Sequence, residues 1–224
     1  MVLHVGFLTI GQSPRVDVME DASKILSKKI KVTEAGALDN LTKEDVEREL
    51  KPEPGHVVYV TRLRDGSMVK ISKEKILPLL QAKIKEIEEK VDIIVILCSG
   101  EFPEFESKVP IIYPDKLLKS FIQGISFKGV LGVLIPVSEQ LDYAKRKWRN
   151  FAETLVAKSI SPYTAEEEHF KAVAWELSKS NPTLIVMDCI GYSLRHKTIV
   201  HEITGKPTIS TRGIVFRVLN ELVE

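Results

Sequence analysis

Two cysteines are the residues of this chain best suited to transfer a proton. Cys98 and Cys189 each end a nearly continuous apolar run, and their spacing does not match that of a zinc site. A thiolate is a base and a thiol is an acid. Two thiols on opposite faces of a carbon acid can therefore remove a proton from one side and replace it from the other. The predicted chemistry is that of a racemase or epimerase acting beside a carboxylate or carbonyl.

Polar loops at predicted strand ends supply the residues that would serve these thiols. Ligands of open parallel sheets bind at the carboxyl ends of the strands, where loops meet helix N-termini. Four such loops are predicted at 11–15, 98–103, 136–140 and 188–193, and we expect them to converge on one cleft. The substrate-binding residues that we predict are Gln12, Ser13, Arg15, Arg62, Ser99, Gly100, Glu139, Gly191 and Tyr192.

Hydrogen-bond donors in these loops suit an enolate intermediate, whose oxygen needs N–H or O–H partners. The expected donors are Ser13, Ser99, Gly100 and Gly191. Arg15 can bind a substrate carboxylate through two parallel N–H groups. Cys189 precedes a predicted helix that carries Arg195 and His196, and positive charge there would favour the thiolate.

Each of these residues also has an interpretation without chemistry. Cysteines are often buried as small hydrophobes, and Cys98 and Cys189 could also form a disulfide in an oxidised sample. Loop 11–15 lacks both the spaced glycines of a dinucleotide site and the lysine of a P-loop, so it could be only a turn and a helix start. Arg62 is typical of a solvated hairpin charge, and Glu139 of a surface carboxylate.

The elements predicted around these loops alternate between strands and helices. Apolar runs predict strands at 2–10, 31–38, 91–98, 110–113, 129–135, 154–160, 183–189 and 206–209. Helical periodicity and capping residues predict helices at 14–29, 42–51, 73–90, 138–151, 164–180, 193–204 and 211–223. A β-hairpin near 56–71 interrupts the alternation, because Val- and Thr-rich segments flank the turn Asp65-Gly66. Alternation of this kind predicts parallel sheets.

The pattern divides into two similar halves, because the strands at 91–98 and 183–189 both follow an amphipathic helix and both end in a cysteine. We predict a first α/β domain over 1–125, joined by the C-terminal helix 211–224, and a second over 126–210.

Composition narrows the class of partner. Lys and Arg number 32 against 31 Asp and Glu, a net charge of +1, so no overall field favours nucleic acid. The first apolar run is interrupted by His4 and followed by a Gly/Ser/Pro loop, so neither a signal peptide nor a membrane span is expected. Two unclustered cysteines fit a reducing cytoplasm. A homodimer is expected only because it is the commonest soluble assembly.

Several motifs together resemble the AroM family. They are Leu8-Thr-Ile-Gly-Gln-Ser-Pro-Arg15, Leu63-Arg-Asp-Gly66, Leu97-Cys-Ser-Gly-Glu-Phe102, Ile135-Pro-Val-Ser-Glu-Gln140, Lys147-Trp148 and Met187-Asp-Cys-Ile-Gly-Tyr192. That family is similar to the aspartate/glutamate/hydantoin racemase superfamily. The resemblance implies two Rossmann-like parallel-sheet domains with a pseudo-two-fold relation, an active-site cleft, and paired cysteines that work without a cofactor or metal.

The resemblance also implies a function. Cys98 and Cys189 would occupy the two cysteine positions of a racemase, epimerase or isomerase acting on a small carboxylate or cyclic amide. This chain has Cys98-Ser-Gly and Asp188-Cys-Ile-Gly where amino acid racemases of the superfamily typically have Cys-Asn-Thr and Gly-Cys-Thr-Glu. Two alternatives are a non-catalytic protein that binds or senses a small molecule, and a lyase or decarboxylase that uses one cysteine.

Overall fold

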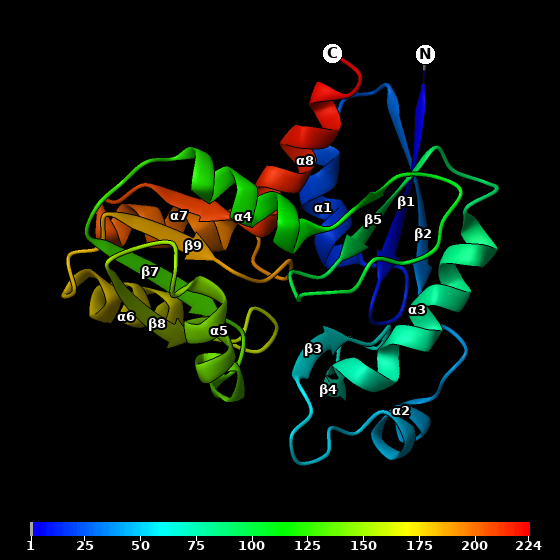
Figure 1. The fold of residues 1–224 in the computed structure, drawn as a ribbon, viewed down its shortest axis with the longest axis horizontal. Helices are drawn as coiled ribbons and strands as arrows, with labels where there is room; N and C mark the ends of the chain where they lie inside the picture. Colours follow the sequence, from blue (N-terminus) through cyan, green and yellow to red (C-terminus); the bar gives the residue numbers. More distant parts are fainter. Residues whose placement is uncertain (1) are drawn as a thin grey trace. The chain divides into compact units, whose positions relative to one another are not determined.

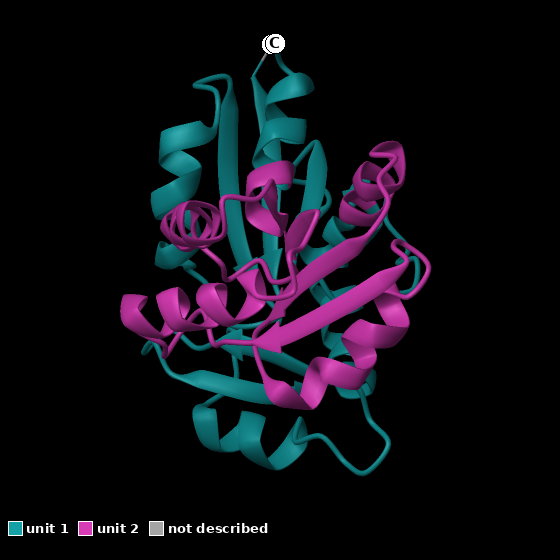
Figure 2. Cartoon of the chain, turned by 90° about the vertical axis from the view of Figure 1, so that its left-hand side faces the viewer, with its two compact units in different colours: residues 1–116, 215–224 teal, residues 117–214 magenta. Residues whose placement is uncertain are grey.

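The chain is an α/β protein with two parallel sheets and a separate hairpin, as a computed structural model describes it for residues 2–224 (Figure 1). It divides into two compact units, coloured separately in Figure 2. Unit 1 comprises residues 1–116 and 215–224, and unit 2 comprises residues 117–214. The α/β class and the two parallel sheets predicted from the sequence are confirmed.

Unit 1 contains the first parallel sheet and the hairpin. Its elements are β1 (Leu3–Thr9), α1 (Val16–Ile25), β2 (Ile30–Gly36), α2 (Lys43–Glu49), β3 (Val58–Arg62), β4 (Met68–Ser72), α3 (Lys73–Ile87), β5 (Ile93–Leu97) and β6 (Ile111–Ile112). Helix α4 (Pro114–Gly124) leads from this unit into the next. Strands β3 and β4 pair antiparallel, which confirms the predicted hairpin.

Unit 2 contains the second parallel sheet. Its elements are β7 (Val130–Ile135), the short 3₁₀ helix η1 (Ser138–Gln140), α5 (Leu141–Trp148), β8 (Thr154–Ser159), α6 (Glu167–Ser178), β9 (Leu184–Met187), α7 (Leu194–Thr204) and β10 (Thr208–Ser210). Helix α8 (Thr211–Glu221) begins here and ends in unit 1.

The two parallel sheets have the same topology. Their strand orders are β2-β1-β5-β6 and β8-β7-β9-β10, so that in each sheet the first strand lies between the second and the third. Such a reversal of strand order opens a crevice beyond the carboxyl ends of the first and third strands. The third strand is β5 in one unit and β9 in the other, and each is followed by one of the two cysteines.

The register sets which loops start at the same edge of each sheet. In unit 1, Thr9 is opposite both Gly36 and Leu97, so the loops after β1, β2 and β5 begin together. In unit 2, Met187 is opposite Leu134 and Ser210, so the loops after β7, β9 and β10 do the same.

Local sequence signals place several helix ends where the sequence predicts them. Thr42 forms a capping box with Asp45 at the start of α2, and the Ser72 hydroxyl accepts the Lys75 N–H at the start of α3. Each cap satisfies backbone donors that the first helical turn leaves unbonded.

One helix end was predicted wrongly, and one helix was not predicted. Helix α1 ends at Ile25 rather than near Lys29, because Leu26 is extended and Ser27 donates its backbone N–H to Asn220 of α8. Helix α4 is not among the predicted elements, although its apolar residues recur at helical spacing.

The C-terminal helix returns to the first sheet. The rings of Phe7 in β1 and Phe216 in α8 stack 5.9 Å apart, and the Asn220 side chain donates to the carbonyl of Ile25. These contacts explain why residues 215–224 belong to unit 1. None of the helices in residues 2–224 is long and apolar enough to cross a membrane.

Candidate active site

Cys98 lies at the strand reversal of unit 1, directly after β5. Its side chain is half-buried, and its Sγ accepts a hydrogen bond from the backbone N–H of Gly100 at 3.3 Å. Loop 10–15 starts at the same edge, after β1. The structure thus brings Cys98 and Gly100 to the edge where the sequence predicts a ligand.

A tyrosine ring fixes the backbone that follows Cys98. Tyr59 of β3 donates its hydroxyl to the carbonyl of Glu101 at 2.8 Å and is almost fully buried. A methyl group on Gly100 would overlap the Tyr59 ring. Position 100 therefore requires glycine for the loop to lie this close to the hairpin.

Cys189 occupies the equivalent position in unit 2, after β9. Its side chain is 6% exposed and belongs to the hydrophobic cluster of this unit. Its Sγ accepts the backbone N–H of Gly191 at 3.4 Å. A Cβ on Gly191 would lie 2.7 Å from the Tyr163 ring and 2.8 Å from the Pro162 ring, so glycine is again required.

The two cysteine loops therefore repeat one arrangement. In each, the glycine two residues after the cysteine donates its N–H to the sulfur and packs against a tyrosine ring. Hydrogen bonds donated to sulfur stabilise the thiolate more than the thiol. No disulfide joins Cys98 and Cys189.

A buried arginine that the sequence analysis did not identify holds the Cys189 loop. Arg212 of α8 has no exposed surface, and its guanidinium donates to the carbonyls of Ile190 at 2.9 Å and Gly191 at 3.1 Å. An arginine side chain keeps its charge at all physiological pH values. Arg212 therefore places a permanent positive charge beside the loop that presents the Cys189 thiol.

The residue before Cys189 is fixed by a second buried network. The Asp188 carboxylate accepts from Lys147 Nζ at 2.9 Å and from Trp148 Nε1 at 2.8 Å. Lys147 and Asp188 are each only 7% exposed, so the pair is largely removed from water. The motif residues Lys147 and Trp148 thus act on the cysteine loop through Asp188.

Tyr192, predicted to bind substrate, is completely buried, and its hydroxyl donates to the Ile160 carbonyl at 2.8 Å. Burial raises the pKa of this hydroxyl well above its usual value, and Cys189 and Asp188 raise it further. The side chain therefore joins the Cys189 loop to the end of β8.

Arg195 and His196 have their own partners in the structure. Arg195 makes two hydrogen bonds of 2.8 Å with the Glu167 carboxylate on the surface, where the ion pair lowers the pKa of Glu167. His196 stacks on Phe170 with ring centroids 4.0 Å apart, and its Nδ1 accepts the Ser193 N–H. In the structure, Arg212 rather than Arg195 donates to the Cys189 loop.

In loop 11–15, Gln12 and Ser13 bind neighbouring parts of unit 1. The Gln12 amide donates to the Leu41 carbonyl at 2.7 Å and accepts the Arg64 N–H at 2.8 Å. Ser13 donates its hydroxyl to Asp39 at 2.8 Å. These bonds fix the loop against the hairpin, and contact of either side chain with substrate stays a prediction.

Arg15 and Arg62 line one cavity of about 390 Å³ within unit 1. The Arg15 fork binds Asp17 through two hydrogen bonds of 2.8 Å, and Thr9 accepts a third at 3.1 Å. Arg62 Nε donates to the Gly66 carbonyl of its own hairpin at 3.1 Å. Asp17 therefore occupies the guanidinium donors of Arg15 that we predicted for a substrate carboxylate. A substrate carboxylate could bind there only by displacing the Asp17 carboxylate.

The remaining predicted site residues differ in exposure. Ser99 is buried beside Cys98, whereas Glu139 is exposed in η1 and accepts from the Ser138 hydroxyl at 3.2 Å. Within residues 2–224, His, Cys, Asp and Glu form no group of three or more that could hold a metal ion.

Comparison with known proteins identifies both a family and a fold. The sequence model of the family described as "AroM protein" matches residues 5–223. No curated protein matches this chain in sequence.

Three solved structures with this fold are enzymes. Allantoin racemase from Klebsiella pneumoniae is 12% identical, with a TM-score of 0.62 over 99% of this chain and 87% of that one. Maleate isomerase from Pseudomonas putida S16 is 14% identical, with a TM-score of 0.62 over 99% and 93%. Unliganded arylmalonate decarboxylase is 9% identical, with a TM-score of 0.64 over 100% and 93%. At these identities the similarity shows the fold.

Proposed function

The chain belongs to the AroM family, and we propose that it is a cofactor-independent racemase, epimerase or isomerase acting on a small carboxylate or cyclic amide. The observation that carries the proposal is the repeated thiol loop. Cys98 and Cys189 follow the third strand of sheets with the same topology, and each sulfur accepts the N–H of a glycine. Cysteines kept only to fill a core would not need this repeated hydrogen bond.

The proposed reaction transfers two protons. One cysteine, as thiolate, removes the proton from the carbon beside the carboxylate or carbonyl. The C–H bond breaks, an S–H bond forms, and the electron pair enters an enolate. The other cysteine, as thiol, donates its proton to the opposite face of that carbon and becomes the thiolate. The substrate is inverted, and the two sulfurs have exchanged protonation states.

Other groups of unit 2 support this role for Cys189. Arg212 places positive charge on the Cys189 loop, and Lys147 and Trp148 hold Asp188 directly before the sulfur. A base held in a fixed position is more effective than a mobile one, because less ordering is needed in the transition state. The racemase and the isomerase that share the fold support this class of reaction.

Proton exchange with solvent tests the function directly. The protein is incubated in deuterated water with amino acids, hydantoins and small dicarboxylates, and loss of the α-proton signal is followed by proton NMR. We expect exchange with at least one compound, and none with the matched Cys98→Ser/Cys189→Ser protein. Compounds that raise the melting temperature of the wild-type chain without exchange or turnover would instead indicate a binding protein.

A decarboxylase is the second candidate function, because arylmalonate decarboxylase shares the fold. In a decarboxylation by this chain, a C–C bond would break, carbon dioxide would leave, and the electron pair of the bond would enter an enolate. One thiol would protonate that enolate and become a thiolate, which would then take a proton from water. This mechanism needs one of the two cysteines. Release of carbon dioxide from substituted malonates, retained in one of the two Cys→Ser variants and lost in the other, would favour it over racemisation.

A further inference from the structure

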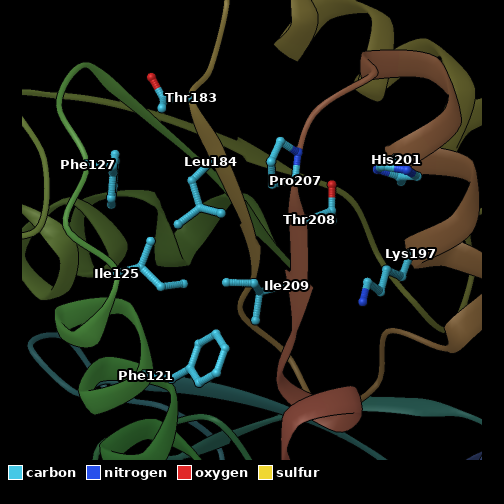
Figure 3. Close-up of a pocket in the computed structure, with 10 residues that line it drawn as sticks. All are labelled: Phe121, Ile125, Phe127, Thr183, Leu184, Lys197, His201, Pro207, Thr208 and Ile209. Atoms are coloured by element: carbon cyan, nitrogen blue, oxygen red, sulfur yellow. The ribbon is translucent and has the colours of Figure 1, made fainter.

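The cavity of about 390 Å³ in unit 1 is lined mainly by charged side chains. Its lining comes from residues 14–17 and 20, at the start of α1, and from residues 62–66 of the hairpin. The cavity of about 590 Å³ in unit 2 differs, because its lining is mostly apolar and residues 207–209 lie between Lys197 and the apolar side chains (Figure 3). The cavity of unit 1 has the size of a small-molecule site and offers charged groups to a ligand.

The three arginines that line this cavity differ in their partners. Arg15 binds the Asp17 carboxylate through two hydrogen bonds of 2.8 Å, and Arg64 Nη2 lies 3.4 Å from the Asp39 carboxylate. Arg62 is half-buried, and no carboxylate within residues 2–224 forms an ion pair with it. Because an arginine keeps its charge at all physiological pH values, Arg62 brings to the cavity a positive charge that lacks a carboxylate partner in the described chain.

Most of the donors of Arg62 remain for a ligand. Its Nε donates to the Gly66 carbonyl at 3.1 Å, and no acceptor within residues 2–224 takes a hydrogen bond from the four N–H groups on Nη1 and Nη2. Nη2 lies 3.0 Å from the point where Gly66 would carry a Cβ, and Gly66 itself lines the cavity. The guanidinium therefore lies against the hairpin turn at the cavity, and two parallel N–H groups of a guanidinium can bind one carboxylate.

The other carboxylates that line the cavity have partners of their own. Glu20 pairs with Lys24 at 2.9 Å, and Asp65 accepts both the backbone N–H and the hydroxyl of Ser67. These hydrogen bonds and the charge of Lys43 lower the pKa of Asp65. The ionised carboxylates repel a ligand with two negative charges more strongly than a ligand with one.

We propose that this cavity binds a small aliphatic monocarboxylate, with its carboxylate on Arg62 and its apolar body against Pro14 and Val16. Both of these apolar residues are exposed, Val16 by 72%, so a ligand can cover apolar surface there. The Tyr59 ring, which contacts the Cys98 loop, and the Arg62 side chain leave opposite faces of β3, because the two residues are three positions apart. The site is therefore on the other face of the strand from the contact with the Cys98 loop.

NMR titration with matched ligands tests this proposal. The probes are 4-methylpentanoate and the neutral 4-methylpentanamide, which share a shape and differ in charge, and the backbone amide signals of the protein give each Kd. We expect the carboxylate to bind about tenfold more tightly than the amide, as for one charge-assisted contact. Arg62→Gln should weaken carboxylate binding to the level of the amide, and Val16→Ser should weaken both ligands. Arg146→Gln, on the surface of α5 in unit 2, should change neither.

Because Arg62 is half-buried and Val16 is exposed, both variants should fold, as the dispersion of the amide signals will show. Arg62→Lys keeps the charge and should bind the carboxylate more tightly than Arg62→Gln does. Equal affinity for the acid and the amide would overturn the proposal, as would wild-type affinity in Arg62→Gln.

Two further results would contradict the assignment. One is tighter binding of dianionic inorganic phosphate than of the carboxylate, and the other is absence of binding to folded wild-type protein at about 10 mM carboxylate. The proposal does not rest on the thiol chemistry, so the same affinities are expected in Cys98→Ser.

Discussion

The backbone N–H of Gly191 donates to Sγ of Cys189 across 3.4 Å. The same relationship joins Gly100 to Cys98 at 3.3 Å. Each pair lies at the strand reversal of its own sheet, where α/β proteins place their ligands. The repetition gives both sulfurs a backbone donor that favours the thiolate, and it leads to predictions about the groups that hold each loop in place.

The glycine at position 100 is required for packing. Gly100→Ala should destabilise the protein by about 2 kcal/mol, because its methyl group overlaps the buried Tyr59 ring. Gly124→Ala is the matched control, since no atom lies within 4 Å of its added Cβ. Urea unfolding measures both variants. Equal stability of the two would show that the Cys98 loop moves away from Tyr59 without cost.

Arg212 should act as a positioning residue for Cys189. Arg212→Met leaves the carbonyls of Ile190 and Gly191 without this donor, and we expect a loss of about 3 kcal/mol in unfolding free energy. Arg212→Lys should retain part of the proton-exchange rate, because lysine keeps the positive charge but cannot donate to both carbonyls with the geometry of a guanidinium. The exposed Arg146→Met serves as control. An exchange rate equal in Arg212→Met and wild type would refute the positioning role.

The buried Lys147–Asp188 pair should show strong coupling. Lys147→Met leaves the buried Asp188 carboxylate without its ion-pair partner. We expect this variant to lose about 3–5 kcal/mol of unfolding free energy. Adding Asp188→Asn removes that charge and keeps an acceptor for Trp148 Nε1, so the double variant should be more stable than Lys147→Met alone. Chemical unfolding of the wild type, Lys147→Met, Asp188→Asn and the double variant gives the coupling energy of the pair. Additive effects would mean that the pair is not coupled.

Tyr192 should make stability fall at high pH. Burial raises the pKa of Tyr192 in the folded chain above the unfolded value of about 10. Below pH 10 the hydroxyl is protonated in both states, and its full contribution to the free energy of unfolding is present. Above that pH the hydroxyl ionises first in the unfolded state, which stabilises that state, and the contribution is lost. Tyr192→Phe should therefore be about 1 kcal/mol less stable than wild type at pH 7, through loss of the bond to Ile160. The difference should shrink between pH 10 and 11 in urea unfolding, and a constant difference would contradict the burial of this hydroxyl.

Most of the scaffold could be predicted from the sequence, because its signals are local. Apolar runs mark the strands, and Thr42, Ser72 and Ser193 cap their helices at the expected residues. The strand-end rule placed Cys98 and Cys189 at the correct edges of their sheets. The partner of Ser13 in loop 11–15 was not predictable, because Asp39 is 26 residues away in the sequence and reaches Ser13 only in the folded chain.

The main omission was Arg212, for which no local motif exists. Its burial arises from the way α8 packs after β10, which periodicity alone does not reveal. One signal was present: Arg212 follows a predicted strand, at the same edge as the other candidate loops. Applying the strand-end rule to that last strand would have identified it.

Stereospecific exchange in the two single-cysteine variants tests the central claim most directly. Cys98→Ser and Cys189→Ser are incubated in deuterated water with each enantiomer of the substrate that the wild-type protein racemises. In the proposed two-thiol mechanism each enantiomer presents its proton to a different sulfur, so we predict that both variants lose racemisation and that each retains slow exchange with the opposite enantiomer. Wild-type racemisation in either variant would contradict a mechanism that uses both thiols.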